Sequence, residues 1–381
     1  MRVRRVPNQA GGPGSFELLD DADQPIPIVT GFLQHLAARG YSPNTLSAYA
    51  HDLQHFLRFL AQQDLGYTEF RPPHALLLVE YLRGLPSRDQ VQRLSPVLCT
   101  STDGPPGARL SAPTINRILA AASSFYEYLI LSEQLTGREN PIQQTDDPAR
   151  ARVAERHRPA LGGASRQRPI RRVVRVRTVQ RVPRPLSEEQ VNQLLGALHR
   201  WRDRAMLLLM LHGGLRPGEV LNLHLEDIQY GRRRVIVRYR TDHPKGARTK
   251  SRQERVVDLH EPEALAAVST YVMEERPREA DSTLVFLVGG RGAKRCEPLS
   301  YAALAKLFAR CCERVGIHDS WVTLHTLRHT HATRMWEGGM RELALMRRLG
   351  HASPESTQLY TRVADPLLVA EYRRAMGEEE A

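Results

Sequence analysis

The stretch His325-Thr-Leu-Arg-His-Thr-His-Ala-Thr333 decides how the second half of this chain is interpreted. Its composition favours a helix, so His325 and Arg328, three residues apart, are expected to share one face. His329, four residues after His325, raises the alternative of a metal site. No carboxylate or cysteine ligand set accompanies the two histidines, so we favour an interpretation without a metal.

Two further patterns flank this stretch. The segment Gly213-Gly-Leu-Arg-Pro-Gly-Glu219 predicts Arg216 at the start of a helix and Glu219 one turn later. A guanidinium at that position is well placed to bind a phosphate oxygen. Downstream, His351 stands nine residues before Tyr360. Each pattern alone has an ordinary structural explanation, and it is their order and spacing that point to one site.

Together these residues suit phosphoryl transfer without a metal. Arg216 and Arg328 can donate to the non-bridging oxygens of a phosphodiester, where negative charge develops in the transition state. Tyr360 is the predicted nucleophile, and its ordinary pKa of ~10 means that it needs a nearby base or positive field. A phosphotyrosine keeps the energy of the broken bond, so religation to another strand needs no nucleotide. We therefore expect no cofactor.

Proton transfer falls to other side chains. His325 is expected to accept the proton of the nucleophile, and His351 to add a hydrogen bond to the phosphate. The leaving 5′-oxygen needs an acid, for which Lys250 is the first choice. Lys245 competes with it, since both lysines lie between the predicted strands 234–240 and 254–259.

Charge points to the same class of partner. The chain has 381 residues and a net charge of +12, which favours a polyanion such as double-stranded DNA. Between residues 150 and 184 there are twelve arginines and one acidic residue, which predicts a DNA-tracking linker or, alternatively, a solvated basic segment. The arginines expected to contact DNA are Arg166, Arg168, Arg171, Arg172, Arg175, Arg177 and Arg181.

Composition excludes several other classes. Hydrophobic residues make up 41% of the chain, but none of its apolar runs is long enough to span a bilayer. The four cysteines form no Cys-x-x-Cys pair, so neither a disulfide framework nor a zinc site is indicated. We expect a cytoplasmic protein, associated with the bacterial nucleoid.

The chain divides into segments of different character. Ser42 before Pro43 caps a helix with an apolar stripe, and a comparable stripe follows Ser111. Ser187-Glu-Glu-Gln190 is a capping box that opens a second domain. The predicted segments are a flexible leader (1–24), a helical DNA-binding domain (25–142), an arginine-rich linker (143–185), a catalytic domain (186–364) and a tail (365–381).

The motifs at Gly214–Glu219, His325–Thr333, Leu349–His351 and Tyr360–Arg362 resemble the signature of the tyrosine recombinase, or phage integrase, family. The resemblance implies a mostly α fold with a small antiparallel sheet, in which a helical core-binding domain and an α/β catalytic domain clamp duplex DNA. It also implies tetramers on two DNA sites, strand exchange through a Holliday junction, and in some cases a partner recombinase or accessory protein. The segment Pro366–Met376 resembles the C-terminal helix that packs on a neighbouring subunit.

Two alternative functions remain less favoured. A type IB topoisomerase would use the same chemistry without bringing two sites together, and the two-domain layout and tail speak against it. A DNA-binding regulator on the same scaffold would be expected to lack a catalytic side chain, and none is missing here. The sequence does not separate the roles of integrase, resolvase and transposase.

Overall fold

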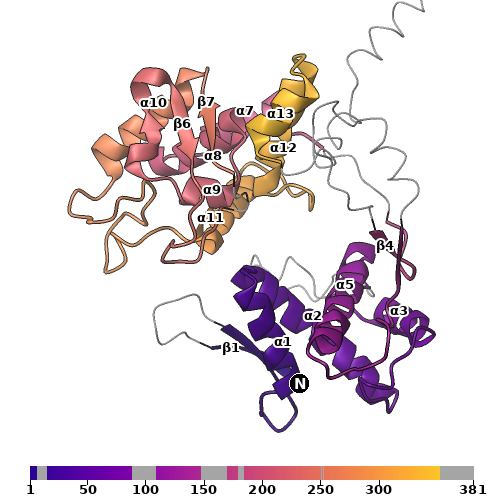
Figure 1. The fold of residues 1–381 in the computed structure, drawn as a ribbon. Helices are drawn as coiled ribbons and strands as arrows, with labels where there is room; N and C mark the ends of the chain where they lie inside the picture. Colours follow the sequence, from indigo (N-terminus) through magenta and orange to yellow (C-terminus); the bar gives the residue numbers. More distant parts are fainter. Residues whose placement is uncertain are drawn as a thin grey trace, which may run out of the picture. The chain divides into compact units, whose positions relative to one another are not determined.

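The computed structural model describes residues 1–6, 15–87, 109–146, 170–178, 184–249, 251 and 253–351. Its contacts divide the chain into two compact units, one containing the described residues up to 178 and the other those from 184 (Figure 1). Both units are mostly helical with small antiparallel sheets, which confirms the predicted fold class. None of the described helices is long and apolar enough to cross a membrane.

In the described part of the first unit, the apolar faces of four helices meet in one core. Ser42 and Ser111 act as the predicted N-caps, each accepting a hydrogen bond from the backbone N–H three residues later. Phe32, Phe56 and Phe125 are fully buried in this core. The helices are α1 (Pro27–Ala38), α2 (Pro43–Gln62), α3 (His74–Gly84) and α5 (Ala112–Leu131).

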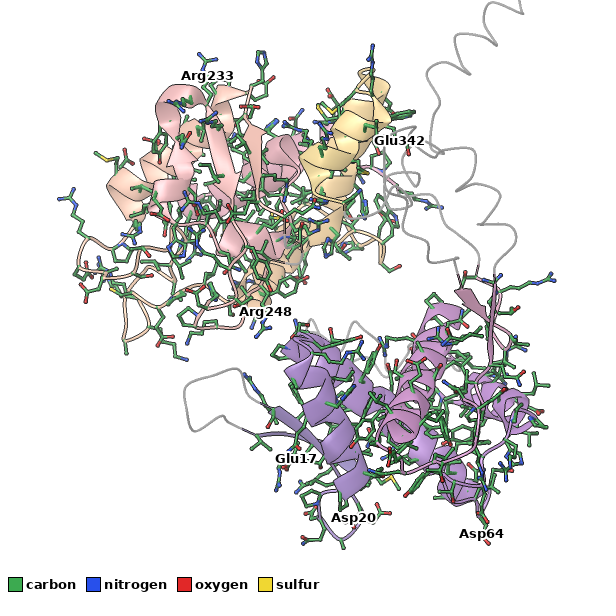
Figure 2. All side chains as sticks on the ribbon, in the orientation of Figure 1. Glu17, Asp20, Asp64, Arg233, Arg248 and Glu342 are labelled. Atoms are coloured by element: carbon green, nitrogen blue, oxygen red, sulfur yellow. The ribbon has the colours of Figure 1, made fainter. Side chains whose placement is uncertain are left out.

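The prediction of a flexible leader over residues 1–24 is wrong for the residues that the structure describes. Strands β1 (Arg2–Val6) and β2 (Ser15–Leu19) pair antiparallel, and Leu18 is fully buried in the helical core. Glu17, labelled in Figure 2, accepts a hydrogen bond of 2.8 Å from Arg4 across the pair. The Gly, Pro and Asp content favoured a flexible segment, but the structure has two short strands there, and their apolar residues complete the core.

Part of the predicted linker also belongs to the first unit. Strand β4 (Ile170–Arg172) pairs with β3 (Gln144–Asp146), and the residues that follow alternate between inward and outward positions. Val174 and Val176 pack against the helical core, and Asn116 holds Val176 by two hydrogen bonds of 2.8 and 2.9 Å to its backbone. This apolar alternation explains why residues 173–177 lie against the helical domain.

The second unit has its own core. Its capping box is confirmed, because Ser187 accepts from the backbone of Gln190 while the side chain of Gln190 accepts in return. Its elements are α7 (Glu188–Gly196), α8 (Trp201–Gly213), α9 (Pro217–Leu221), η1 (Leu225–Asp227), β5 (Ile228–Gln229), η2 (Tyr230–Arg232), β6 (Arg234–Val237), β7 (Arg255–Asp258), α10 (Pro262–Thr270), the π-helical turn η3 (Tyr271–Glu275), α11 (Tyr301–Arg314), α12 (Leu324–Glu337) and α13 (Glu342–Leu349).

Helix α8 is the centre of the second unit. Every residue from 205 to 211 is at most 3% exposed, as expected for a helix that is apolar on all sides. It packs against α10 and α12 and delivers its C-terminal end to the segment that holds Arg216. The candidate site therefore begins at the C-terminal end of a buried helix.

The predicted hairpin is present but shorter than expected. Strands β6 and β7 pair antiparallel from Arg234 with Asp258 to Val237 with Arg255, and β5 pairs with the outer side of β6. Residues 284–288 form no further strand in the described chain, and isolated bridges occur there at Leu284 and Leu287.

Gly214 is expected to tolerate no side chain. It ends α8 with φ of +63°, and a Cβ there would overlap the ring of His331. We expect Gly214→Ala to lower the free energy of unfolding by about 3 kcal/mol, combining left-handed strain with overpacking. Gly316→Ala is the matched control, because Gly316 has φ of +73° but open space around it, so it should lose only about 1–2 kcal/mol. Urea denaturation of both variants measures the difference, and equal losses would contradict the role of His331.

Candidate active site

The site is organised around the buried carboxylate of Glu219 on α9. Its side chain has no solvent exposure, and Arg255 binds both carboxylate oxygens, with Nη1 donating to Oε1 at 3.0 Å and Nη2 to Oε2 at 2.7 Å. Arg216 donates from Nη1 to Oε1 at 2.8 Å, and Nη1 of Arg328 lies 4.0 Å from Oε2. Burial alone would raise the pKa of Glu219, but Arg255 first, and then Arg216 and Arg328, lower it to about 2.

The structure brings the two predicted phosphate-binding arginines together. Nη2 of Arg216 donates to the carbonyl of Gly350 at 3.1 Å, and Nη2 of Arg328 donates to the neighbouring carbonyl of Leu349 at 2.6 Å. Nη1 of Arg328 also donates to the carbonyl of Gly214 at 2.6 Å. Arg216 comes from the start of α9 and Arg328 from the buried face of α12, so their convergence is a tertiary feature.

His351 follows directly after these carbonyls, at the end of α13. Burial and the nearby charges of Arg328, Arg216 and Arg255 lower the pKa of His351 to about 3. The imidazole is therefore neutral at physiological pH, with one nitrogen able to donate a hydrogen bond and the other to accept one. This is the form needed to donate to a phosphate oxygen without adding a charge.

His325 and His329 occupy different environments on α12. His325 is exposed one turn before the buried Arg328, whereas His329 is partly buried. Burial and the charges of His325 and Arg328 lower the pKa of His329 to about 4. Among the residues that the structure describes, no group of three His, Cys, Asp or Glu side chains is arranged to hold a metal ion.

Of the two candidate lysines, the structure describes Lys245 and the residues that lead up to Lys250. Lys245 forms an ion pair with Glu297, with Nζ 2.6 Å from Oε2. Lys250 lies outside the described residues. Just before it, Thr249 is buried and its hydroxyl donates to the carbonyl of Arg238 at 3.2 Å, which anchors the loop to the end of β6.

Several predicted residues lie outside the described part of the chain. Tyr360 and the tail after it are among them, as are Arg166, Arg168 and Arg181, and the side chain of Arg171. Arg175 and Arg177 are exposed, as expected for DNA-contacting side chains. Arg172 is partly buried, and burial lowers its pKa.

Sequence reasoning missed three supporting residues. Besides Arg255, a pair formed by the buried His331 and the partly buried Arg348 joins α12 to α13: Nε of Arg348 donates to Nε2 of His331 at 3.0 Å, and Nδ1 of His331 donates to the carbonyl of Leu211 at 2.9 Å. Burial and Arg348 lower the pKa of His331 to about 3, so the ring stays neutral. The sequence offers little signal for them, because His331 stands among other His and Thr residues, Arg348 follows Arg347, and Arg255 follows a polar stretch.

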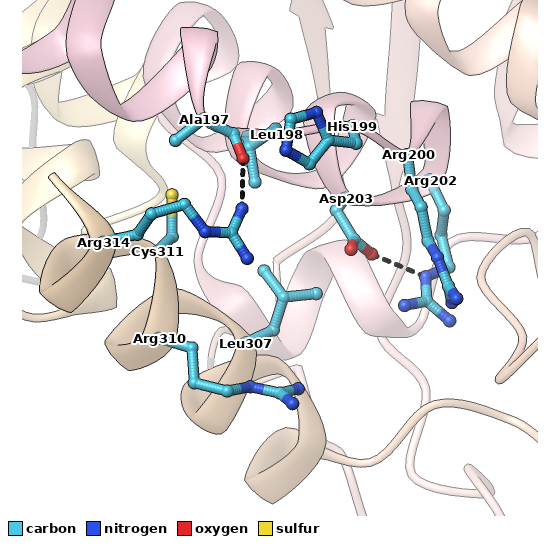
Figure 3. Close-up of a pocket in the computed structure, with 10 residues that line it drawn as sticks. All are labelled: Ala197, Leu198, His199, Arg200, Arg202, Asp203, Leu307, Arg310, Cys311 and Arg314. Atoms are coloured by element: carbon cyan, nitrogen blue, oxygen red, sulfur yellow. Dashed lines mark hydrogen bonds and ion pairs between the residues drawn. The ribbon is translucent and has the colours of Figure 1, made fainter.

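A separate pocket lies between the start of α8 and the end of α11 (Figure 3). It has a volume of about 420 Å³, and its arginines include Arg202, which is bound to Asp203, and Arg314, which is bound to the carbonyl of Ala197. None of the predicted catalytic residues lines it. Helix α8 spans ~20 Å between this pocket and Gly214, so the two sites are distinct.

Comparisons with known proteins agree with the geometry. Residues 184–366 match the phage integrase family and residues 29–88 match the phage integrase N-terminal SAM-like domain. The chain belongs to this family, whose members include the tyrosine recombinases, enzymes that cleave and rejoin DNA.

Individual relatives extend over most of the chain. Transposase A from transposon Tn554 of Staphylococcus aureus is 28% identical over 381 residues, covering 100% of this chain and 99% of the relative. Tyrosine recombinase XerC of Caldanaerobacter subterraneus subsp. tengcongensis is 27% identical, covering 90% and 84%. The Tn1549 transposon integrase in complex with transposon right end DNA shares the fold, with a TM-score of 0.59, 16% identity, and coverage of 92% and 99%.

Removing the charge of Glu219 should destabilise the second unit. Because its pKa falls from an ordinary 4.5 to about 2, the carboxylate contributes stability that is complete above pH 4.5 and is lost as the pH falls toward 2. We expect Glu219→Gln to lower the free energy of unfolding at pH 7 by about 3 kcal/mol. The variant should also lose this part of the dependence of stability on pH. Urea titrations between pH 3 and 7 measure both effects.

Glu263→Gln is the matched control for that variant. The carboxylate of Glu263 pairs with Arg204 but is 46% exposed, so its loss should cost no more than about 1 kcal/mol. Equal losses for the two variants would mean that Glu219 is not an organising charge.

Proposed function

We propose that this chain is a site-specific recombinase that cleaves and rejoins DNA through a 3′-phosphotyrosyl link to Tyr360. One observation carries the proposal: Arg216 and Arg328 both lie against the buried carboxylate of Glu219, and both bind the backbone carbonyls that directly precede His351. Three groups that can bind phosphate oxygens, drawn from three separate segments, make a site for one backbone phosphate.

The proposed reaction needs only side chains of this protein. The phenolic oxygen of Tyr360 attacks the phosphorus while its proton passes to His325, and the bond to the 5′-oxygen breaks. Arg216 and Arg328 stabilise the charge on the non-bridging oxygens. The guanidinium of Arg216 has five N–H donors, and it uses two of them on Glu219 and on the carbonyl of Gly350. The remaining donors are available to the phosphate. Attack of a 5′-hydroxyl from another strand on the phosphotyrosine reverses these steps.

Lys250 is proposed as the acid that protonates the leaving 5′-oxygen. Lys245 is paired with Glu297, which makes it the weaker choice. The backbone carbonyl of Arg248, two residues before Lys250, lies where a Cβ on Gly218 would be, so this part of the loop packs against the start of α9 beside Arg216. We therefore propose that Lys250, two residues further along the chain, acts on the same phosphate.

The assembly follows from the reaction. Exchange between two duplexes requires two cleavage sites on each, so we propose a tetramer on two DNA sites, with a partner recombinase or an accessory protein as a further possibility for synapsis. Such a complex would act on chromosomal DNA in the cytoplasm, at the nucleoid. The similarity to a transposase favours mobile-element DNA as the substrate.

Tyr360→Phe should abolish covalent capture of DNA and leave DNA binding intact, because only the attacking oxygen is removed. A duplex nicked near the scissile phosphate traps the intermediate, and a denaturing gel reveals the adduct. Tyr230→Phe, which changes an exposed tyrosine on η2, is the control and should form adduct normally. An adduct that persists without the hydroxyl of Tyr360 would refute the nucleophile assignment.

The basic segment should act on the DNA backbone and not on its sequence. We expect Arg175→Gln with Arg177→Gln to weaken binding equally to all duplexes and to reduce the dependence of affinity on salt by about one counterion for each arginine. Binding titrations at several salt concentrations measure the slope. A slope equal to that of the wild type would place these exposed arginines away from DNA.

A further inference from the structure

The end of α13 is held by three arginines in an unusual arrangement. The last carbonyls of a helix lack partners within the helix and carry partial negative charge. Here three consecutive carbonyls each accept from a different guanidinium. Arg255 donates to the carbonyl of Arg348 at 2.8 Å, Arg328 to that of Leu349 at 2.6 Å, and Arg216 to that of Gly350 at 3.1 Å.

Arg255 differs from the other two arginines in how completely the protein uses it. All three nitrogens of its guanidinium donate to protein acceptors: Nη1 and Nη2 to Glu219, and Nε to the carbonyl of Arg348. Its side chain is 8% exposed. A guanidinium engaged in this way cannot also bind a phosphate by its own fork of donors, so any role in the reaction runs through its neighbours.

The space for Arg255 is part of the fold. A Cβ on Gly350 would lie 2.8 Å from Nη1 of Arg255, and Gly350 has φ of +62°, so glycine is favoured there for two reasons. Gly350 immediately precedes His351. The guanidinium thus lies against the backbone that sets the position of His351, while its other side holds the carboxylate beside Arg216 and Arg328.

We infer that Arg255 is a positioning residue for DNA cleavage, which fixes Glu219 and the end of α13 and thereby the orientation of Arg216, Arg328 and His351. This inference rests on the proposed function. It adds to that function a residue on the sheet that touches no reacting atom.

The physical reason is competition for one carboxylate. Arg255 satisfies both oxygens of Glu219 with two parallel hydrogen bonds, the strongest geometry for such a pair. Without it, the buried carboxylate would depend on Arg216 and Arg328 alone, and would draw their donors toward the protein and away from the phosphate. Preorganised donors lose effect when they must be reoriented during the reaction.

Arg255→Lys and Arg255→Gln test this inference on the full chain. Lysine keeps the charge but not the planar fork, and glutamine keeps neither. We expect single-turnover cleavage of the nicked duplex to fall about 10- to 100-fold in the lysine variant and further in the glutamine variant, since small misplacements cost this much. Affinity for the same duplex, measured in parallel, should stay unchanged.

Arg240→Lys is the matched control. Arg240 binds both oxygens of the buried Asp227 and its side chain is 14% exposed, but its side-chain hydrogen bonds reach none of the proposed catalytic residues that the structure describes. Its loss should lower the melting temperature about as much as Arg255→Lys while leaving the cleavage rate unchanged. The comparison separates a loss of stability from a loss of positioning.

A second readout is the pH profile of cleavage. Arg255 is the main group that lowers the pKa of Glu219, so in Arg255→Gln this carboxylate should gain a proton at a higher pH, and the acid side of the rate profile should move upward. A purely structural role would reduce the rate without moving the profile.

The outcomes are distinct. The inference is overturned if Arg255→Lys cleaves at the wild-type rate, if it loses cleavage only in proportion to a loss shared with Arg240→Lys, or if the acid limb of Arg255→Gln stays in place. If the wild-type chain forms no covalent adduct with DNA, or if Tyr360→Phe forms the same adduct, the proposed function itself is wrong. The positioning role then fails with it.

Discussion

The carboxylate of Glu219 is surrounded by three guanidinium groups, and the rest of the second unit is arranged so that they can stay there. A buried cation without a partner is costly, and one carboxylate cannot neutralise three arginines. The described part of the chain compensates in part through the carbonyls at the end of α13 and that of Gly214. The remaining excess of positive charge supports the proposal that the cluster binds a phosphate, because an anion would complete its electrostatic balance.

Helix ends deliver most of this cluster. Arg216 lies at the start of α9, Arg328 in the first half of α12, and His351 just after α13, while α8 ends at Gly214 beside them. Helices that are packed in the core hold the residues at their ends in fixed positions. Loops of the same length would leave the donors to be reoriented toward the phosphate during the reaction. The hydrogen-bonded pair of His331 and Arg348 serves this arrangement by joining α12, α13 and the end of α8.

Local motifs made Arg216, Glu219, Arg328 and His351 predictable, because each belongs to a short pattern whose residue types and spacing are informative by themselves. Arg255 was not predictable in the same way, since its partners are 36 and 93 residues away and only the fold brings them together. The strands at residues 2–6 and 15–19 were missed for a different reason: average composition suggested a flexible leader, whereas Leu18 and Leu19 are fully buried.

The hairpin combines two tasks that differ in what they demand of the backbone. An acid that protonates a leaving oxygen must approach a moving atom, whereas a positioning charge must stay fixed. Arg255 stands on β7, held by the register of the ladder with β6, and the sequence places Lys250 five residues earlier, in the loop that precedes the strand. On the proposed mechanism, a strand that begins at Arg255 would keep the charges around Glu219 fixed while Lys250 approaches the DNA. The boundary between loop and strand is therefore itself a part of the site.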